Sequence, residues 1–200
     1  MSATERQITA RDILPDDEYA AQRKARRAAL LPVKKLRRVA LGPDCTFYFE
    51  SFETMLFQVQ EMLVVEKGGA EQLVDELAAY NPLIPQGREL VATVMFEIND
   101  EVRRAGILGA LGGVEDHFFL RIGDHHAKAI PEGDIDRTRD GKTSSVHFVR
   151  FPFSLEQAAG LRDPATAVMI GCDHPRYGHL AMLTDATRTE LCKDLAQAPS

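Results

Sequence analysis

Residues 38–66, RVALGPDCTFYFESFETMLFQVQEMLVVE, contain the signals that decide the fold. Gly-Pro-Asp at 42–44 separates two short apolar segments, which is typical of the turn of a β-hairpin. Beyond the hairpin, apolar side chains recur at intervals of three and four residues from Phe52 to Leu63, the pattern of one helix face. The stretch therefore predicts a hairpin followed directly by an amphipathic helix over 52–66.

The rest of the chain continues this order, with helices early and strands late. Further helices are expected over 70–80 and 101–111, from Leu155 onward, and from Thr184 or Asp185 to 195. Strands are expected over 90–98, 116–122, 127–130, 144–151, 167–172 and 179–183. This order predicts a single α+β domain whose mostly antiparallel sheet, open or strongly curved and barrel-like, is covered by N-terminal helices. The ends, 1–15 and 196–200, are expected to be loosely ordered tails.

The bulk composition is that of a folded, acidic protein. Its 200 residues suffice for one domain with a core, and a net charge of −6 disfavours general affinity for nucleic acid or anionic membranes. No apolar stretch approaches the roughly 20 residues that cross a bilayer, and the N-terminus lacks the apolar core of a secretory signal. Three cysteines without a CxxC pair exclude a cysteine-rich zinc site. We therefore expect a cytoplasmic protein with no membrane partner.

A basic segment over 23–38 carries eight Lys or Arg side chains and no acidic one. Its Ala- and Leu-rich part favours helix, which Pro32 is expected to break or restart. The candidates for docking an acidic partner are Arg26, Arg27, Lys34 and Lys35. Two alternatives stay open, a solvated helix face that pairs with the protein's own acids and a grip on nucleic-acid phosphates. Because aromatic residues are not interleaved with the cations, no specific nucleic-acid binding is expected.

The most specific local motif is CDHPRYGH at 172–179. If Pro175 to Gly178 forms a four-residue hairpin loop, His174 and His179 face each other as the first cross-strand pair, about 5 Å apart. Two imidazoles at that separation can bind one metal ion. The competing interpretation is structural, since a histidine near a strand end is more often a surface or hydrogen-bonded residue.

A transition-metal site needs further ligands, which imidazole and carboxylate side chains can supply. The candidates are His117, Glu61 and Glu97, each expected on the more polar side of its strand or helix. The residues expected to orient these ligands are Asp173, Tyr177, Gln58 and Glu66. The pattern permits these side chains to converge but does not require it, because glutamates at the end of an apolar stripe usually reach water or pair with a base.

Several short blocks of the sequence together resemble the pattern of a known family. They are RVALGP at 38–43, QVQEML at 58–63, YNPLIP at 80–85, and DHP at 173–175 with Tyr177 and His179. With these blocks the chain resembles a bacterial family, domain of unknown function 3501, from about Asp12 to Leu195. The resemblance implies no reaction. Relatives are often encoded beside a rubrerythrin-like di-iron protein and an iron–sulfur protein of the heterodisulfide-reductase type, which implies a redox or oxidative-stress role by association.

Two functions from different classes follow as hypotheses. The first is a metal-binding redox or oxidative-stress accessory protein, with iron favoured over manganese or zinc because mixed imidazole and carboxylate ligands suit non-haem iron. The second is a non-catalytic subunit that docks on a redox complex, with the rubrerythrin-like and iron–sulfur proteins as implied partners. The sequence has no Walker A motif, nucleophile elbow or HExxH motif, so no nucleotide cofactor is expected and no catalytic residue is assigned.

Overall fold

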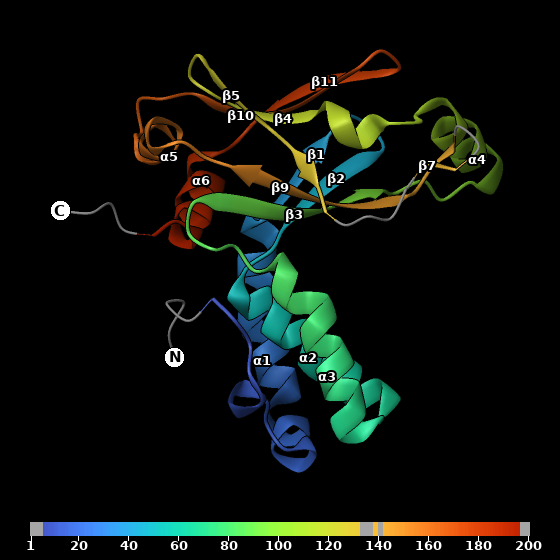
Figure 1. The fold of residues 1–200 in the computed structure, drawn as a ribbon, viewed down its shortest axis with the longest axis vertical. Helices are drawn as coiled ribbons and strands as arrows, with labels where there is room; N and C mark the ends of the chain where they lie inside the picture. Colours follow the sequence, from blue (N-terminus) through green and yellow to red (C-terminus); the bar gives the residue numbers. More distant parts are fainter. Residues whose placement is uncertain (1–5, 133–137, 140–141, 197–200) are drawn as a thin grey trace.

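The structure, a computed structural model, describes residues 6–132, 138–139 and 142–196. The parts of the expected tails at 1–5 and 197–200 lie outside the described residues. Within the described part of the N-terminal segment, Ile8 is buried and its backbone exchanges two hydrogen bonds with the Asn81 side chain. Figure 1 shows two regions, a body built on two β-sheets and a stalk of three helices that projects from it.

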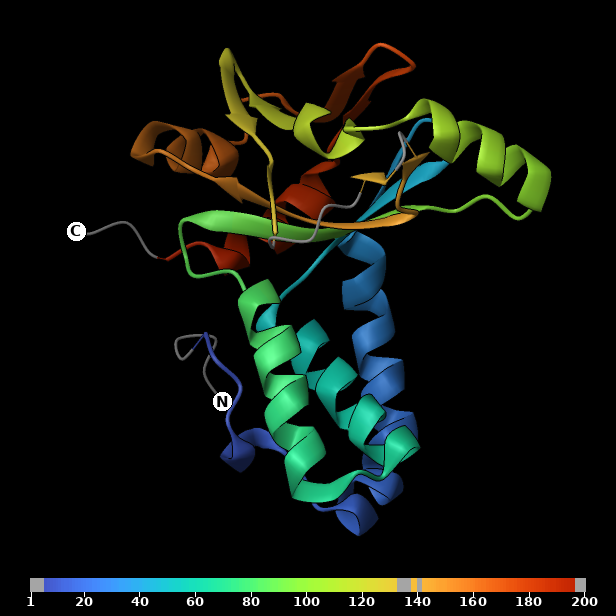
Figure 2. The ribbon, with the colours of Figure 1, turned by 45° about the vertical axis from the view of Figure 1, so that its right-hand side comes forward.

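The stalk consists of α1 (Asp16–Leu36), α2 (Phe52–Glu66) and α3 (Gly69–Tyr80). Figure 2 shows α2 between the other two helices. The predicted helix over 52–66 is confirmed at both ends, and Ser51 begins it: the Ser51 hydroxyl accepts a hydrogen bond from the Thr54 amide, while the Thr54 hydroxyl accepts one from the Ser51 amide. The expected break at Pro32 is wrong. α1 continues through this exposed proline, where water can replace the one lost backbone hydrogen bond.

Sheet A has five antiparallel strands in the order β1-β2-β3-β9-β6. Their bounds are β1 (Arg38–Leu41), β2 (Cys45–Phe49), β3 (Glu89–Phe96), β9 (Val146–Pro152) and β6 (Ile130–Pro131). The predicted hairpin is β1–β2, with Leu41 paired to Cys45. Along β3 the side chains alternate, so that Ala92 and Val94 join the core of the body while Val91 packs with the apolar side chains of the stalk. Sheet A therefore separates the stalk from the rest of the body.

Sheet B has four antiparallel strands in the order β11-β10-β4-β5. Their bounds are β11 (Tyr177–Met182), β10 (Val168–His174), β4 (Phe118–Ile122) and β5 (His125–Lys128). Sheets A and B share one core, in which Phe47 of β2 meets Phe118 of β4 edge to face, with 5.1 Å between ring centroids. The predicted α+β class with antiparallel pairing is confirmed. The described strands form separate sheets and no closed barrel.

Shorter elements complete the fold of the stalk and the body. They are α4 (Glu101–Ala110), α5 (Leu155–Arg162), α6 (Asp185–Leu191), the strand pair β7 (Thr138–Arg139) and β8 (Lys142–Thr143), and the 3-10 turns η1 (Ala10–Asp12), η2 (Asn81–Leu83), η3 (Val114–His117) and η4 (Cys192–Asp194). Ser154 and Gln157 form the expected capping box of α5, and Thr184 caps α6. No described helix has the length and apolar character needed to span a bilayer.

Candidate functional site

α1 is thinly covered by the rest of the protein. Of its 21 residues only Tyr19 is buried, and Leu31 is 57% exposed. Helices obtain most of their stability from packing of an apolar face, and this face of α1 is incompletely packed. Two grooves run along α1, one on each side of its contact with α2, and Leu30 and Phe57 contribute to both.

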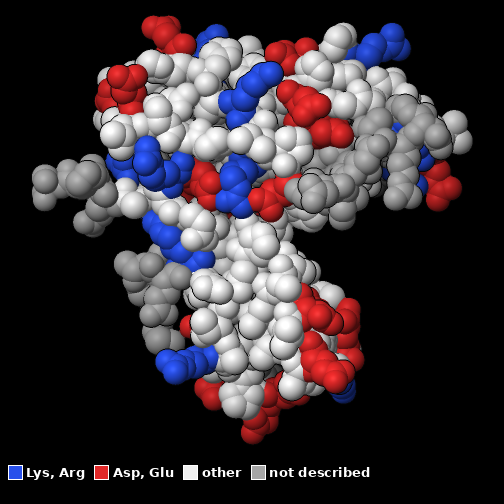
Figure 3. All heavy atoms as spheres, viewed as in Figure 1, with Lys and Arg blue, Asp and Glu red and all other residues white. Residues whose placement is uncertain are grey.

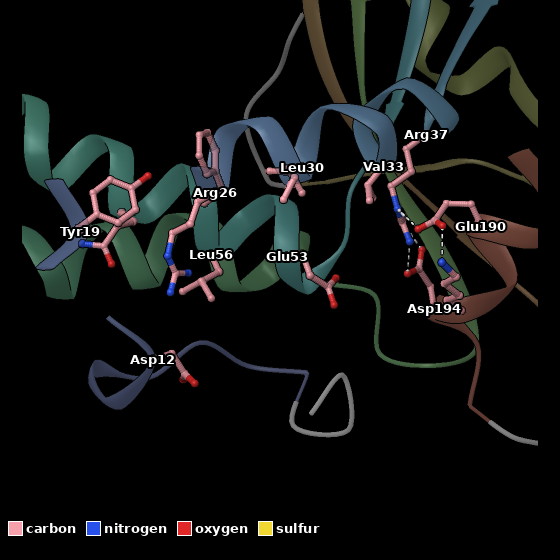
Figure 4. A pocket seen from close by; sticks show the side chains of 14 residues that line it. Asp12, Tyr19, Arg26, Leu30, Val33, Arg37, Glu53, Leu56, Glu190 and Asp194 are labelled. Atoms are coloured by element: carbon pink, nitrogen blue, oxygen red, sulfur yellow. Dashed lines mark hydrogen bonds and ion pairs between the residues drawn. The ribbon is translucent and has the colours of Figure 1, made fainter. Parts of the chain in front are cut away.

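The first groove, called the Arg37 groove, has a volume of about 410 Å³ and extends along α1 from Tyr19 to Arg37 (Figure 4). At one end the Arg37 guanidinium, 3% exposed, donates to both carboxylate oxygens of Asp194 at 2.7 and 2.8 Å and to Glu190 at 3.2 Å. It also donates to the backbone carbonyl of Glu50 at 3.1 Å. Because these buried charges are paired with one another, they are not available to bind a charged ligand. The ion pairs instead connect the stalk to the C-terminal turn of the body.

The second groove, called the basic groove, lies on the other side of α1 and has a volume of about 600 Å³. Four cations line it: Arg27, Lys34, Lys35 and Arg38. Between them the apolar side chains of Leu30, Leu31 and Phe57 form a wall, and the Lys34 ammonium lies 5.7 Å from the Phe57 ring centroid. The groove therefore combines an apolar surface with a positively charged rim.

The eight cations of 23–38 divide into two groups by their partners. Three are ion-paired with described carboxylates: Arg23 with Glu61, Arg37 with Asp194 and Glu190, and Arg38 with Glu97. The other five form no ion pair with any described residue: Lys24, Arg26, Arg27, Lys34 and Lys35. The unpaired group includes all four residues predicted to dock a partner. Figure 3 shows acidic side chains of the stalk gathered at its free end and along its α3 side, and α3 itself carries Glu71, Asp75 and Glu76 without a cation.

A third cavity, called the Glu50 cavity, adjoins the basic groove and shares Lys34, Tyr48 and Gln58 with it. Its volume is about 430 Å³, and it lies between the stalk and sheet A. The Glu50 side chain, 9% exposed, accepts hydrogen bonds from the hydroxyls of Thr54 at 2.7 Å and Thr93 at 2.8 Å. Burial raises the pKa of this carboxyl, while the two hydroxyls oppose the shift. A buried carboxyl with a displaced pKa beside a cavity is a feature of functional sites.

The expected four-residue loop at Pro175 to Gly178 is wrong. β10 and β11 pair His174 with Tyr177 and Cys172 with His179, so the loop is the two residues Pro175 and Arg176. This register places both histidines on one face, as a diagonal pair with Tyr177 between them. The His179 ring packs against Tyr177, with 4.4 Å between centroids, and lies close to the Gly42 backbone.

His174 has a different set of neighbours. Its ring contacts the His117 ring, with 4.9 Å between centroids, and the His117 Nδ1 atom lies 2.8 Å from the Asp173 carboxylate. The Nδ1 atom of His174 accepts a hydrogen bond from the Arg176 amide. Burial lowers the pKa of His174 and favours its neutral form. The structure thus brings together His117, Asp173 and His174, and places His179 elsewhere on the same hairpin.

The two carboxylates expected as ligands, Glu61 and Glu97, are each engaged by other partners. Glu61 is on α2 in the stalk, where its bond with Arg23 and a second one from the Tyr19 hydroxyl lower its pKa. Glu97 follows β3, where hydrogen bonding from Thr46 and from the Tyr48 hydroxyl lowers its pKa. The described residues contain no group of three or more His, Cys, Asp or Glu side chains that could hold a metal ion.

The residues expected to orient a metal site are also separated. The Tyr177 hydroxyl donates to the Leu41 carbonyl at 2.7 Å and accepts from the Asp44 amide at 3.1 Å, so it joins β11 to the β1–β2 turn. Glu66, at the exposed end of α2, accepts a hydrogen bond from the Gln72 amide. Gln58 lines both the basic groove and the Glu50 cavity.

Sequence reasoning missed Glu50 and the buried ion network around Arg37. Arg37 is one cation in a run of eight, and nothing local distinguishes it from its neighbours. Its partners Glu190 and Asp194 are more than 150 positions away. The position of Glu50 directly before a capping box marks a helix start and gives no sign of burial.

Comparisons with known proteins agree with this fold. A family model described as protein of unknown function, DUF3501, matches residues 7–195. A crystal structure of a novel protein of unknown function from Burkholderia pseudomallei K96243 is 35% identical, with a TM-score of 0.87, over 95% of this chain and all of that one. Among curated proteins there is no match.

Proposed function

Because this chain belongs to the DUF3501 family of proteins of unknown function, we propose a function on physical grounds: it is a docking subunit that binds an acidic, amphipathic segment of a partner protein along α1. The observation that carries the proposal is the pairing pattern of 23–38. Five of its eight cations form no ion pair with a described residue, and they flank half-exposed apolar side chains.

The charge pattern favours an acidic partner. Unpaired Lys and Arg side chains on one helix attract an acidic surface over roughly 8–10 Å at physiological ionic strength and speed its association. The protein as a whole has a net charge of −6, so this positive patch stands out against an acidic background. A like-charged partner would be repelled, which gives the surface specificity.

The apolar pattern favours an amphipathic segment over a simple polyanion. Leu31 is 57% exposed, and Leu30, Phe57 and Val33 are half-buried along the two grooves. An apolar stripe inside a charged rim is the arrangement by which helices and grooves recognise amphipathic segments. Nucleic acid would use the cations and leave these side chains in water.

The partner class comes from the resemblance of the sequence. The resemblance implies that relatives are often encoded beside a rubrerythrin-like protein and an iron–sulfur protein, and we propose that one of these two supplies the acidic segment. The chain would then act by positioning a redox protein, without itself carrying out the chemistry.

The test is a calorimetric titration of the full chain with the rubrerythrin-like and iron–sulfur proteins encoded in the same genome. It is carried out at low and at physiological salt concentration. The charge-reversed variant replaces Arg26, Arg27 and Lys35 with Glu. We expect its affinity to fall by at least about tenfold, since several rim charges then repel the partner. Lys34 is left unchanged because it also lines the Glu50 cavity.

A matched control reverses three exposed cations of the body, Lys128, Lys142 and Arg176, and so changes the net charge equally. It should bind like the parent chain. Equal losses in the two variants would mean that only net charge matters, and absence of binding by both redox proteins at low salt would remove the proposal.

Metal binding is a second candidate, supported by one observation. His117 contacts both the His174 ring and the Asp173 carboxylate at the end of the β10–β11 hairpin. Imidazole with carboxylate suits iron, manganese or zinc, although these three side chains as placed do not form a group that could hold an ion. Elemental analysis of protein purified without a tag, before and after anaerobic loading with iron, tests it. Binding that survives His117→Ala and His174→Ala together would place the metal elsewhere, and no retained metal would refute this candidate.

A further inference from the structure

We propose that the Glu50 cavity binds a free amino acid or a similar small zwitterion, with the ligand ammonium on the Glu50 carboxylate and the ligand carboxylate on the Lys34 ammonium. This inference goes beyond the docking function, and of the groups on which it rests only Lys34 and Gln58 also line the basic groove. It stands on one cavity into which opposite charges project without meeting each other.

Glu50 provides the negative end. Its side chain is buried, and its carboxylate oxygens accept hydrogen bonds from two neutral hydroxyls, those of Thr54 and Thr93. Among the described residues it has no ion-pair partner, since Arg37 donates to the backbone carbonyl of Glu50 and to other carboxylates. A buried carboxylate without a cation is costly, and a ligand ammonium would relieve that cost.

Lys34 provides the positive end. It is exposed on α1, lines the same cavity, and forms no ion pair with a described carboxylate. It is close enough to Glu50 to lower the pKa of that carboxyl by its charge, yet no ion pair joins them. The cavity between the two groups therefore suits a molecule that carries both charges.

The remaining lining fits a small organic molecule. The side chains of Met55 and Met95 are flexible and polarisable, which suits varied apolar groups. The Gln58 side chain lines the cavity and makes no hydrogen bond with a described residue, so its amide is available to a ligand. A volume of about 430 Å³ lies within the usual range for small-molecule sites.

Charge balance separates a zwitterion from simpler ligands. The other charges around the cavity are already neutralised, Arg37 by Asp194 and Glu97 by Arg38. A plain amine would meet the unpaired ammonium of Lys34, and a plain carboxylate would meet Glu50. A molecule with both groups satisfies both ends at once.

The experiment is calorimetric titration of the full chain with each common L-amino acid, β-alanine and γ-aminobutyrate. Two analogues of the tightest-binding zwitterion are titrated as well: the amine that lacks its carboxylate, and the carboxylic acid that lacks its amino group. We expect binding of at least one zwitterion, and affinity at least about tenfold lower for both single-charge analogues, since each loses a charge-assisted hydrogen bond.

Variants assign the two ends. Glu50→Gln keeps the shape of the side chain and removes its charge, while one of the two oxygens that accept from Thr54 and Thr93 becomes an amide donor. This variant should weaken binding of the zwitterion by about tenfold to a hundredfold. Lys34→Met should do the same, and because Lys34 is exposed this variant is expected to fold normally. The control Lys24→Met, on the same helix but outside the cavity, should bind like the parent chain.

The location is tested by NMR of chain labelled at its methionine methyl groups. The Met55 and Met95 signals should shift on ligand addition, while Met169 and Met182 of sheet B should not. No binding by any zwitterion, equal affinity for a single-charge analogue, unchanged affinity in Glu50→Gln, or shifts confined to sheet B would each overturn the proposal.

Discussion

In the body, two antiparallel sheets bury their facing side chains almost completely, whereas in the stalk α1 buries one side chain and leaves grooves on both sides. The apolar core is thus concentrated between the sheets, and five cations that form no ion pair with a described residue lie along α1. The difference indicates a division of roles. The body provides the free energy of folding, and the stalk presents surface that its own packing does not use.

The largest expected effect is in the body. Phe47 is fully buried against Phe118, Phe49 and Phe151. We expect Phe47→Ala to lower the free energy of unfolding by about 4 kcal/mol, because it opens a cavity in a core that two sheets share. Chemical denaturation measures the change. A loss below about 1 kcal/mol would contradict the assignment of stability to the body.

The next effect concerns the joint between the two regions. Arg37→Met would leave Asp194 buried without its cation and would remove one of the two cations of Glu190, so we expect the free energy of unfolding to fall by about 3 kcal/mol at neutral pH. The loss should shrink in mild acid, where the buried carboxyls can take up protons. Lys193→Met, which removes an exposed cation from the same buried Glu190, is the control and should cost under about 1 kcal/mol, because Glu190 keeps its bond with Arg37.

A smaller effect of opposite sign is expected at Glu50. Because burial raises its pKa, the folded chain holds this proton more tightly than the unfolded chain, whose carboxyl titrates near 4.5. Stability from this group is therefore greatest below that pH and is lost as the pH rises through the folded pKa. Glu50→Gln should raise the melting temperature at neutral pH and reduce this pH dependence. Glu66→Gln, at the exposed end of α2, should change neither.

The smallest effect is expected on the surface of α1. Leu31→Ala should change the free energy of unfolding by no more than about 0.5 kcal/mol, because the side chain is already 57% exposed. The same substitution at the fully buried Leu41 should cost about 2–5 kcal/mol. Comparable losses at the two positions, measured by denaturant titration, would mean that α1 is packed more tightly than its exposure indicates.

Helices and caps that were predicted from residues close together in the sequence agree with the structure. The helix over 52–66 and the capping box at Ser154 were predictable because the groups that decide them are within four residues of each other. Two predictions made from local sequence failed because the outcome depended on the surroundings of the residues in the folded chain. Pro32 lies where its missing hydrogen bond faces solvent, and the loop after His174 is shorter than expected because Tyr177 already belongs to β11.

The candidate site was predictable only in part. The cations that we propose for docking could be named because a run of charge is visible in the sequence. Which of the cations in this run lack partners depends on carboxylates brought from α2, the end of β3 and the C-terminal turn. The histidine motif was visible, yet the register of β10 and β11 separated His174 from His179. The register differs from the expected one by two residues, which is enough to place Tyr177 opposite His174 in place of His179, and no local signal reports it.

The sequence by itself determined the α+β class, the order of helices and strands, and the concentration of positive charge in 23–38. Periodicity, turn residues and caps act between near neighbours, so the chain specifies them before it folds. Only the tertiary structure decided that Arg37 is buried and paired while Lys34 is not, and that Glu50 is buried beside a cavity. The reason is physical: the cost of burying a charge depends on partners that arrive from distant segments, and those contacts exist only in the folded chain.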